Sequence, residues 1–340
     1  MSPGRGTLCA VTATTAPSDP RPSRPAPAPL ARSHCRTPVR LSGVIRADHA
    51  RRGAVVTFDG RWYRRAEQGP AGPLILAATS DAHGTTVEVW GPAATPTAAA
   101  EGALEAALAW AGLRDDLTGA GDVLTATDLL RRLVDQVGEV RLGRCPQVAE
   151  AFGRSVLEQL VQGKEARRSI AQMVARCGEQ VDEHRWQWPT AKALGSTPVW
   201  DLRRCGISGR MASALHAGAV ECSRLERARH DWAALDRRLR ALPGVGPWTS
   251  AETRLRLGDP DAVSVGDYHL PTVIGYALSG PDGDGPNGTW TDAGMLELLA
   301  PYAGQRGRVI RLVETAAAAG LVPRRPRRGP RAALSAHRYY

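Results

Sequence analysis

At 340 residues and 43% hydrophobic composition, the chain is long enough for one large domain or two of ordinary size. It has no run of about 18 apolar residues, and the Pro-rich stretch at 17–30 has no apolar signal-peptide core. This predicts a cytoplasmic protein without a membrane partner. Of the net charge of +10, residues 1–40 supply +5 and residues 323–340 supply +6, which leaves −1 for the middle. Bulk charge therefore does not mark the middle as a nucleic-acid-binding surface.

The six cysteines are scattered along the chain, at positions 9, 35, 145, 177, 205 and 222. They form no C-x-x-C pair and no zinc or iron–sulfur spacing, so the sequence predicts reduced thiols and no metal centre. Lysine is scarce, since Lys164 and Lys192 are the only two. This scarcity limits any chemistry that needs an amine nucleophile.

The first part of the chain changes character at about residue 37. Residues 1–36 are rich in Pro, Ser, Ala and Arg with almost no periodicity, which predicts a disordered segment. Residues 37–95 carry short segments rich in β-branched and aromatic residues, such as RWYRRAEQ, PLILAATS and TTVEVWGP. Turn sequences separate these segments, which is typical of a small antiparallel sheet.

From residue 96 to residue 322 the apolar periodicity is helical almost throughout, for example in VLEQLVQGKEARRSIAQMVARCG. Thr125 or Thr127 and Asp292 are predicted to cap helices. The predicted fold class is therefore α+β, with a β-rich lobe followed by a large helical domain. The Arg-rich tail at 323–340 either lies along phosphates or is a solvated end.

The stretch DWAALDRRLRALPGVGPWTSAETRLRLG predicts a helix, a tight turn and a second helix. Gly244 and Gly246 permit positive φ or a close backbone approach, and Pro247 suits the first turn of the second helix. The N–H groups at that helix start form an anion site, for which a DNA phosphate is suitable. An ordinary helix–helix corner remains the alternative.

Asp267 follows 21 residues after Gly246, in VSVGDYHLPTVIGYAL. The pattern predicts a short extended entry and a helix from Tyr268, with Asp267 as its N-cap. A cap and a catalytic carboxylate are compatible, because a helix N-terminus keeps Asp ionised and aimed. His269, in the first turn, is more typical of a structural role than of acid–base chemistry.

The helix–LPGVGPW–helix element followed by VSVGDYHLP resembles the helix-hairpin-helix DNA glycosylases, and within them the DNA-3-methyladenine glycosylase II family. The similarity extends over residues 37–322, and the β-rich lobe matches the family's extra N-terminal domain. It implies a monofunctional enzyme, acting as a monomer, that flips alkylated purines of the 3-methyladenine or 7-methylguanine type out of double-stranded DNA. The enzyme would then hydrolyse the N-glycosidic bond and so begin base excision repair.

The resemblance also assigns roles by position. Asp267 matches the catalytic carboxylate, and Trp248 and Tyr268 match the base pocket. Leu160, preceded by Gln159, matches the wedge that fills the gap left by the flipped nucleotide. In the family the hairpin clamps phosphate and often holds a monovalent cation on its carbonyls; no other cofactor is implied. The predicted DNA-contacting residues are Gln159, Leu160, Gly244, Val245, Gly246 and, apart from the resemblance, Arg306.

Relatives that also cut the DNA backbone carry a Schiff-base Lys two residues after the second hairpin glycine. This chain has Trp248 there, and both of its lysines lie outside the hairpin, so water is favoured as the nucleophile. The chain departs from the family at Glu252, where an aromatic residue is common, and at YAGQRG, which contains Tyr302 and Gln305. These departures leave the preferred base open.

Two rival functions also stay open. A non-catalytic protein could use the same hairpin to recognise distorted duplex, and a glycosylase with lyase activity could cut the strand as well. Arg306 and Arg308 either contact phosphate or pair with acids. Trp186, Trp188 and Trp200 are more typical of packing than of a binding site.

Overall fold

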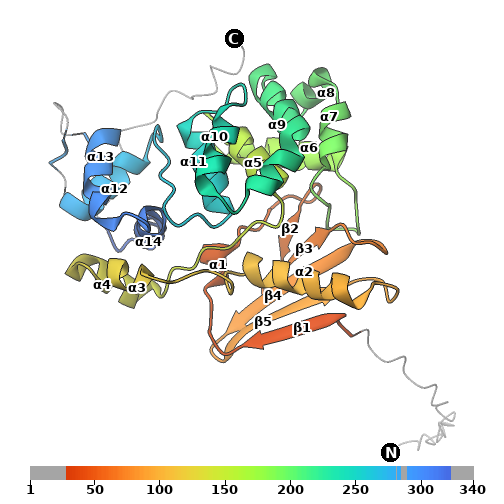
Figure 1. Cartoon of the computed structure of the whole chain (residues 1–340), viewed down its shortest axis with the longest axis horizontal. Coiled ribbons are helices and arrows are strands. Elements are labelled where there is room, and N and C mark those ends of the chain that lie inside the picture. Colours follow the sequence, from red (N-terminus) through yellow and green to blue (C-terminus); the bar gives the residue numbers. More distant parts are fainter. Residues whose placement is uncertain (1–27, 281, 285–288, 323–340) are drawn as a thin grey trace, which may run out of the picture.

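A computed structural model of the chain describes residues 28–280, 282–284 and 289–322. The disorder predicted for residues 1–27 and the role of the tail at 323–340 lie outside these ranges. In Figure 1 a sheet at the bottom carries helix α2 across it, and most of the helices lie above. Among the described residues no helix is both long and apolar enough to cross a membrane. The α+β class predicted from the sequence is confirmed.

The sheet contains five antiparallel strands in the order β1-β5-β4-β3-β2. Their bounds are Ala31–Cys35 (β1), Val56–Phe58 (β2), Tyr63–Glu67 (β3), Leu74–Asp81 (β4) and Gly84–Trp90 (β5). The first strand lies in the segment predicted to be disordered, and that prediction is wrong for residues 31–35. Pairing with β5 orders this edge strand, whose own side chains alternate between half-buried and exposed.

One face of the sheet packs on helices, and its side chains alternate accordingly. Leu76, Ala78, Val87 and Val89 point into the core beside α2 (Thr97–Trp110). A short helix, α1 (Leu41–Val44), also reaches this side, and α5 (Val148–Leu157) meets it through the ion pair of Glu150 with Arg65. The boundary predicted between the β-rich lobe and the helical domain, at residue 96, therefore falls between the last strand and α2, although α2 packs on the sheet.

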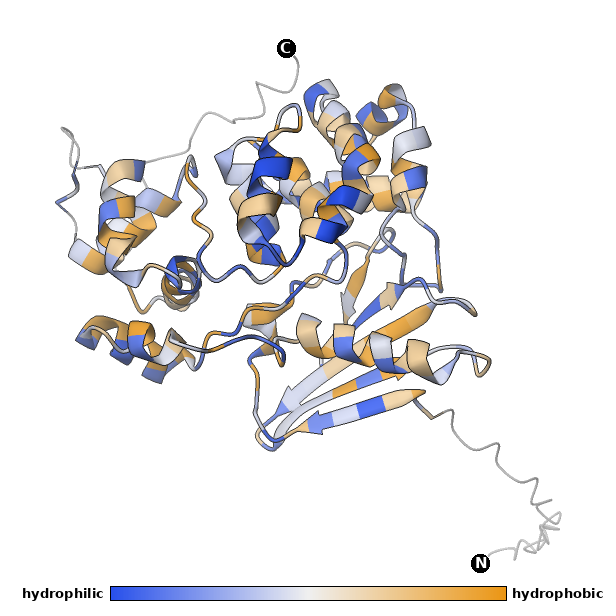
Figure 2. Cartoon of the chain, viewed as in Figure 1, coloured by the Kyte–Doolittle hydropathy of each residue, from blue (hydrophilic) through white to orange (hydrophobic). Residues whose placement is uncertain are grey.

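The helices gather around two separate hydrophobic cores (Figures 1 and 2). The first core joins the sheet to α6 (Gly163–Cys177), α7 (Ala191–Ser196), α8 (Val199–Arg204), α9 (Gly209–Ala228) and α10 (Trp232–Arg240). The second joins α3 (Ala120–Leu124), α4 (Asp128–Val137), α12 (Leu270–Ser279), α13 (Asp292–Leu299) and α14 (Arg306–Ala318). Helix α11 (Pro247–Arg256) and the short 3-10 turn Ala300–Tyr302 complete the fold.

Two details of the predicted helices need correction. The stretch from Val156 to Gly178 is not one helix, because α5 ends at Leu157 and α6 begins only at Gly163. The cap of α13 is Thr291 rather than Asp292, since the Thr291 hydroxyl accepts from the N–H of Gly294. Of the two threonines predicted before α4, Thr127 is the cap, and it accepts from the N–H of Leu130.

A buried ion cluster fastens the sheet to the helical part. Arg65 on β3 and Arg154 on α5 both bind the carboxylate of Glu150, at 2.7 and 2.8 Å, and Arg154 also binds Asp48 at 2.9 Å. Arg65 and Glu150 are almost inaccessible to solvent. Burial acts to raise the pKa of Glu150, but Arg65 and Arg154 prevail and lower it to about 2.

We predict that Glu150→Gln lowers the free energy of unfolding by about 3–5 kcal/mol at pH 7, since it leaves buried guanidinium groups uncompensated. A carboxyl whose pKa is lowered by folding stabilises the folded protein at pH values above its pKa in the unfolded chain. This stabilisation is lost as the pH falls toward the pKa in the folded protein. The deficit of the variant should therefore shrink by about 1 kcal/mol at pH 3.5. Urea unfolding at both pH values measures it.

The matched control is Glu105→Gln, because Glu105 forms an exposed pair with Arg114 at 2.8 Å. An exposed pair of this kind contributes less than about 1 kcal/mol. Equal losses in the two variants at pH 7 would contradict the role given to the buried cluster.

Candidate active site at the helical hairpin

The hairpin predicted from the sequence is present between α10 and α11. Gly244 has φ +78°, a conformation that favours glycine, and the N–H of Val245 donates to the carbonyl oxygen of Leu242 at 3.2 Å. Gly246 is extended, with φ −100°, and a Cβ placed on it would meet nothing within 4 Å. The first glycine thus serves the turn, whereas the second leaves the start of α11 open to a ligand.

Pro247 occupies the first turn of α11, where its missing N–H costs nothing. The N–H groups that follow it have no acceptor within the helix, and the helix dipole adds partial positive charge. Val245 is buried, whereas Gly244 and Gly246 are half-buried and only the Cβ direction of Gly246 is open. This arrangement can bind an anion through the backbone.

Asp267 is held by both of its carboxylate oxygens. Oδ1 accepts from the N–H groups of His269 (2.7 Å) and Leu270 (2.9 Å), and Oδ2 accepts from the indole Nε1 of Trp248 at 2.9 Å. Helix α12 begins at Leu270, two residues later than predicted, and the residue at its N-cap position is His269, whose side chain makes no capping bond. Asp267, two residues earlier, accepts from the first N–H groups of the helix. The carboxylate is therefore fixed in direction between two helix starts.

Two aromatic side chains lie next to this carboxylate. Trp248 is half-buried and points its N–H at Asp267, whereas Tyr268 is 63% exposed. The rings of Tyr268 and His269 meet edge to face, with centroids 4.9 Å apart. The structure thus places both predicted pocket residues beside Asp267, and the indole N–H of Trp248 is a contact that the sequence did not predict.

Leu160 lies at the tip of the turn that interrupts the predicted helix. It is 84% exposed, and with φ +51° it is the single non-glycine residue of positive φ in the described part of the chain. A left-handed leucine in water costs about 1–2 kcal/mol. An apolar side chain held out in this way is suited to insertion into a partner.

The turn that carries Leu160 is tied to the hairpin by its neighbour. The side-chain amide of Gln159 donates to the carbonyl oxygen of Gly244 at 3.0 Å and to the hydroxyl of Thr249 at 2.6 Å. Thr249 is in the first turn of α11. Gln159, predicted as a DNA contact, therefore also fixes the exposed leucine relative to the hairpin.

A second set of contacts joins the same three segments deeper in the protein. Arg256 on α11 binds Glu158 at 2.6 Å and Glu252 at 2.8 Å, and Glu252 also accepts from the hydroxyl of Ser264 at 2.6 Å. Burial acts to raise the pKa of Glu252, but Arg256 and Arg311 lower it below its usual range. Glu252, a departure from the family pattern, is thus a structural link from α11 to the segment that precedes Asp267.

The remaining predicted residues at this end of the chain pair with acids or pack. Arg306 binds Asp261 through two nitrogens, and Arg308 is buried with its guanidinium on Asp115 at 2.5 Å. The Gln305 side chain donates to the carbonyl of Thr118 and accepts from Arg308, and Tyr302 lies in the second core. Trp186 and Trp188 are buried as expected, but Trp200 is 57% exposed.

One carboxyl near the site was missed by sequence reasoning. Glu314 on α14 pairs with Arg311 at 3.0 Å. Its partial burial raises the pKa of Glu314; Arg311 opposes this, and the charges on Glu252 and Asp267 add to it. It shares a helical periodicity with core residues and carries no local signal that could have revealed it.

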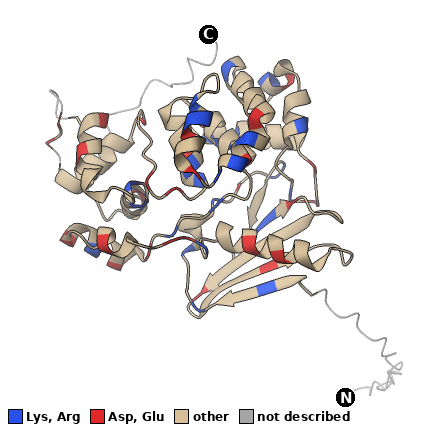
Figure 3. Cartoon of the chain, in the orientation of Figure 1, with Lys and Arg blue, Asp and Glu red and all other residues tan. Residues whose placement is uncertain are grey.

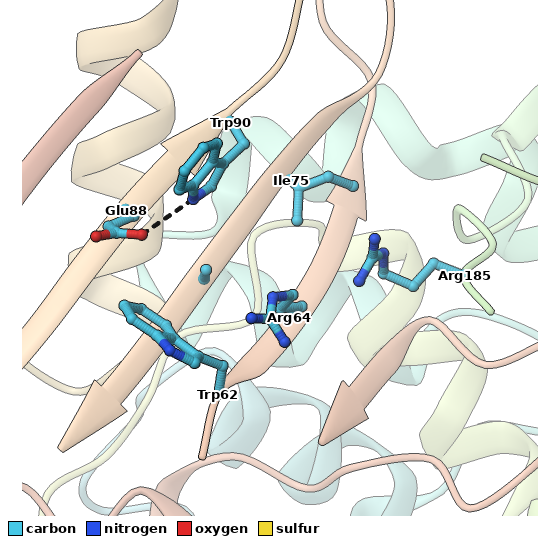
Figure 4. Close-up of a pocket in the computed structure, with 7 residues that line it drawn as sticks. Trp62, Arg64, Ile75, Glu88, Trp90 and Arg185 are labelled. Atoms are coloured by element: carbon cyan, nitrogen blue, oxygen red, sulfur yellow. Dashed lines mark hydrogen bonds between the residues drawn. The ribbon is translucent and has the colours of Figure 1, made fainter. Parts of the chain in front are cut away.

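Figure 3 shows Lys and Arg gathered on the helices at the upper right, around α8 to α11. No cluster of His, Cys, Asp or Glu suited to a metal ion occurs in the ranges that the structure describes. A hollow of about 410 Å³ lies on the outer face of the sheet, where Trp62 and Trp90 surround Arg64 and Glu88 (Figure 4). It contains none of the predicted site residues.

No family model matches the chain. A segment of 154 residues is 34% identical to the probable bifunctional transcriptional activator/DNA repair enzyme AlkA of Mycobacterium tuberculosis, and the match covers 44% of this chain. It spans 31% of that relative's length. The structure superposes on a 3-methyladenine DNA glycosylase from Archaeoglobus fulgidus with a TM-score of 0.70 and 18% identity, over 84% of this chain and 97% of the other.

The chain shares its fold with these solved structures. An 8-oxoguanine glycosylase/lyase from Clostridium acetobutylicum superposes with a TM-score of 0.57 at 12% identity, over 77% of this chain and 98% of the other. In this fold, the hairpin, Asp267 and the Leu160 turn come together from three distant segments. Neither Lys164, in the first turn of α6, nor Lys192, on α7, lies on the hairpin.

We predict that Gln159→Leu lowers the free energy of unfolding by about 1–2 kcal/mol, because it removes two hydrogen bonds and leaves the Gly244 carbonyl oxygen without the amide. Urea unfolding measures the change. Gln162→Leu is the control, since the Gln162 side chain is exposed and makes no cap hydrogen bond. A loss of the same size in both variants would contradict the tie between turn and hairpin.

Proposed function

We propose that this protein is a monofunctional DNA glycosylase that removes alkylated purines of the 3-methyladenine or 7-methylguanine type from double-stranded DNA. The observation that carries the proposal is the fixed carboxylate of Asp267, bound by Trp248 and by the start of α12 beside an open hairpin. The names of the M. tuberculosis relative and of the A. fulgidus neighbour support repair of alkylated DNA. We further propose that the protein acts as a monomer in the cytoplasm.

In this proposal the backbone of Gly244–Gly246 and the first turn of α11 bind a phosphate of the damaged strand. Leu160 enters the gap left by the flipped nucleotide, and its exposure and left-handed backbone support this role. Flipping costs a few kcal/mol and less for a damaged base. The C. acetobutylicum neighbour has also been solved with double-stranded DNA, which supports DNA as the partner.

The chemistry would centre on Asp267. Alkylation at N3 or N7 gives the purine a positive charge, so the base leaves as a neutral group and no strong general acid is needed. The Asp267 carboxylate stabilises the oxocarbenium-like sugar and orients or deprotonates the attacking water. Its cap to α12 and the Trp248 N–H keep it aimed. The faces of Trp248 and Tyr268 offer stacking to the electron-poor base, worth about 0.5–2 kcal/mol.

A monovalent cation on the hairpin carbonyls belongs to the same proposal. The carbonyl oxygens of Leu242 and Gly244 each accept one hydrogen bond, from Val245 and Gln159 respectively, and a carbonyl has a second lone pair. These residues therefore fit such an ion, which would add positive charge near a bound phosphate. Hydrolysis at Asp267 does not pass through it.

We predict that Asp267→Asn abolishes release of methylated purine, with a loss of at least roughly 100-fold. The variant should still fold, because the Asn side-chain oxygen can accept from the N–H groups of α12 as before, and its amide nitrogen removes only the acceptor of the half-buried Trp248 N–H. Free base released from methylated duplex is the readout, followed by strand cleavage with and without alkali. Wild-type strand cleavage should require alkali.

The outcomes of this experiment separate the rival functions. Strand breaks by the wild type without alkali would indicate a lyase and contradict a monofunctional enzyme. Binding of damaged duplex without any base release by the wild type would favour the non-catalytic reader of distorted duplex. Equal release by both proteins would remove Asp267 from the chemistry.

We also predict that Leu160→Ala leaves the free energy of unfolding within about 0.5 kcal/mol, because the side chain is exposed. Base release from duplex should nevertheless fall roughly 10-fold, since the gap after flipping is no longer filled. Val220→Ala removes a comparably exposed apolar side chain, on α9, and should change neither quantity. Unchanged release by Leu160→Ala would contradict the wedge.

A further inference from the structure

A groove of about 770 Å³ lies between loop 48–53, α6 and α8. We call it the arginine groove, because five arginines from these three segments line it together with His49. They are Arg52, Arg167, Arg168, Arg176 and Arg204. None of them belongs to the hairpin, to the Leu160 turn or to the surroundings of Asp267.

Most of this positive charge is not neutralised within the protein. In the part of the chain that the structure describes, Arg52, Arg167, Arg168 and Arg204 form no ion pair, whereas Arg176 pairs with Asp201. The one acid in the lining, Asp48, is occupied. Its carboxylate binds Arg154 at 2.9 and 3.0 Å and accepts from two backbone N–H groups. The groove thus gathers four uncompensated guanidinium groups, an arrangement that repels itself unless an anion is present.

The arginine groove is continuous with the hairpin. Arg204 ends α8, and after a short turn Ser208 caps α9, whose second residue is Arg210. Arg210 is exposed and packs on the turn: a Cβ placed on Gly244 would lie 3.6 Å from its Cγ. The hydroxyl of Ser169 on α6 donates to the carbonyl of Gly206 at 3.4 Å and fixes α6 against the same turn. A basic band therefore runs from Gly244 past Arg210 and Arg204 into the groove.

The groove also lies at a suitable distance from Leu160. Helix α6 starts at Gly163, three residues after Leu160, so Arg167 and Arg168 come four and five residues into it. At 1.5 Å per residue this is about 6–8 Å along the helix axis. Successive phosphates of one DNA strand advance about 3.4 Å along the duplex axis. From the start of α6 to Arg167 and Arg168, the helix therefore covers about two phosphate spacings of a DNA strand.

We propose that the arginine groove binds backbone phosphates of the duplex beyond the hairpin, as a second, sequence-independent contact that extends the footprint on DNA. The proposal rests on the proposed function, since it takes DNA as the partner. Guanidinium groups match phosphate oxygens in bidentate fashion. A free polyphosphate would satisfy the same chemistry, but the continuous band to the hairpin favours DNA. The contact would strengthen binding and leave the hydrolytic step at Asp267 unchanged.

The test replaces Arg167 and Arg168 together by Gln in the full chain. Both side chains are exposed, and thermal unfolding checks that the variant folds. The control is Arg131→Gln with Arg132→Gln, which makes the same change in net charge. These two arginines are adjacent and exposed on α4, a helix that packs on the second core. Binding to an undamaged 25-base-pair duplex is measured across a salt series, and base release from methylated duplex at saturating protein is measured separately.

Because the groove variant can no longer bind two of the phosphates, the slope of log K against log salt should fall by about two, and affinity near 0.1 M salt should fall roughly 10-fold or more. The α4 control should keep the wild-type slope. The base-release rate at saturation should be unchanged in both variants.

Three results would overturn the proposal. One is an unchanged salt slope in the groove variant, and another is an equal drop in the α4 control. The third is binding of inorganic tripolyphosphate that depends on Arg167 and Arg168 but does not compete with duplex, which would assign the groove to a separate polyanion. Failure of the proposed function is distinguishable, because it appears as absent base release by the wild type, whatever the salt slope shows.

Discussion

The arrangement of the site depends on helix α11, which three other segments contact. In its first turn, Trp248 forms a hydrogen bond with Asp267, and Thr249 forms one with Gln159. One turn later, Glu252 accepts a hydrogen bond from Ser264. Short turns bury little apolar surface, so packing alone would not fix their positions relative to the rest of the site. A few hydrogen bonds to one rigid helix do so. Hydrogen bonds to α11 therefore fix the hairpin, the carboxylate and the exposed leucine relative to one another.

Asp267 also lies where the chain passes from one hydrophobic core to the other. Helix α11 packs on α5 and α10 in the first part, whereas α12 belongs to the second core. Because Asp267 caps α12 and binds Trp248 of α11, its carboxylate depends on how the two cores are joined. The buried contact between Arg308 on α14 and Asp115 ties the second core to the segment after α2. A change in the packing between the two cores would therefore change the position of the Asp267 carboxylate.

The sequence predicted those turns and helix starts that are set by residues close together along the chain. The hairpin follows from Gly244, which needs positive φ, and the cap follows from Asp267 ahead of a helix. The break before α6 was missed because the apolar periodicity continues through Leu160, although the backbone there turns left-handed. The tie from Gln159 to Gly244 joins residues 85 positions apart, and no periodicity carries such a contact. Strand β1 was missed for a similar reason, since its order comes from β5.

The distribution of charge on the surface also depends on contacts between residues that are far apart in the sequence. The middle of the chain is nearly neutral as a sum, yet folding sorts its charges by position. Acids such as Asp48, Glu150 and Glu252 are drawn into ion pairs with buried or half-buried arginines. Arg167 and Arg168 on α6 and Arg204 on α8 are left without such partners and line a shared groove. A net charge is thus a poor guide to a binding surface, because an anion responds to the charges within about 10 Å of it and not to the sum over the chain.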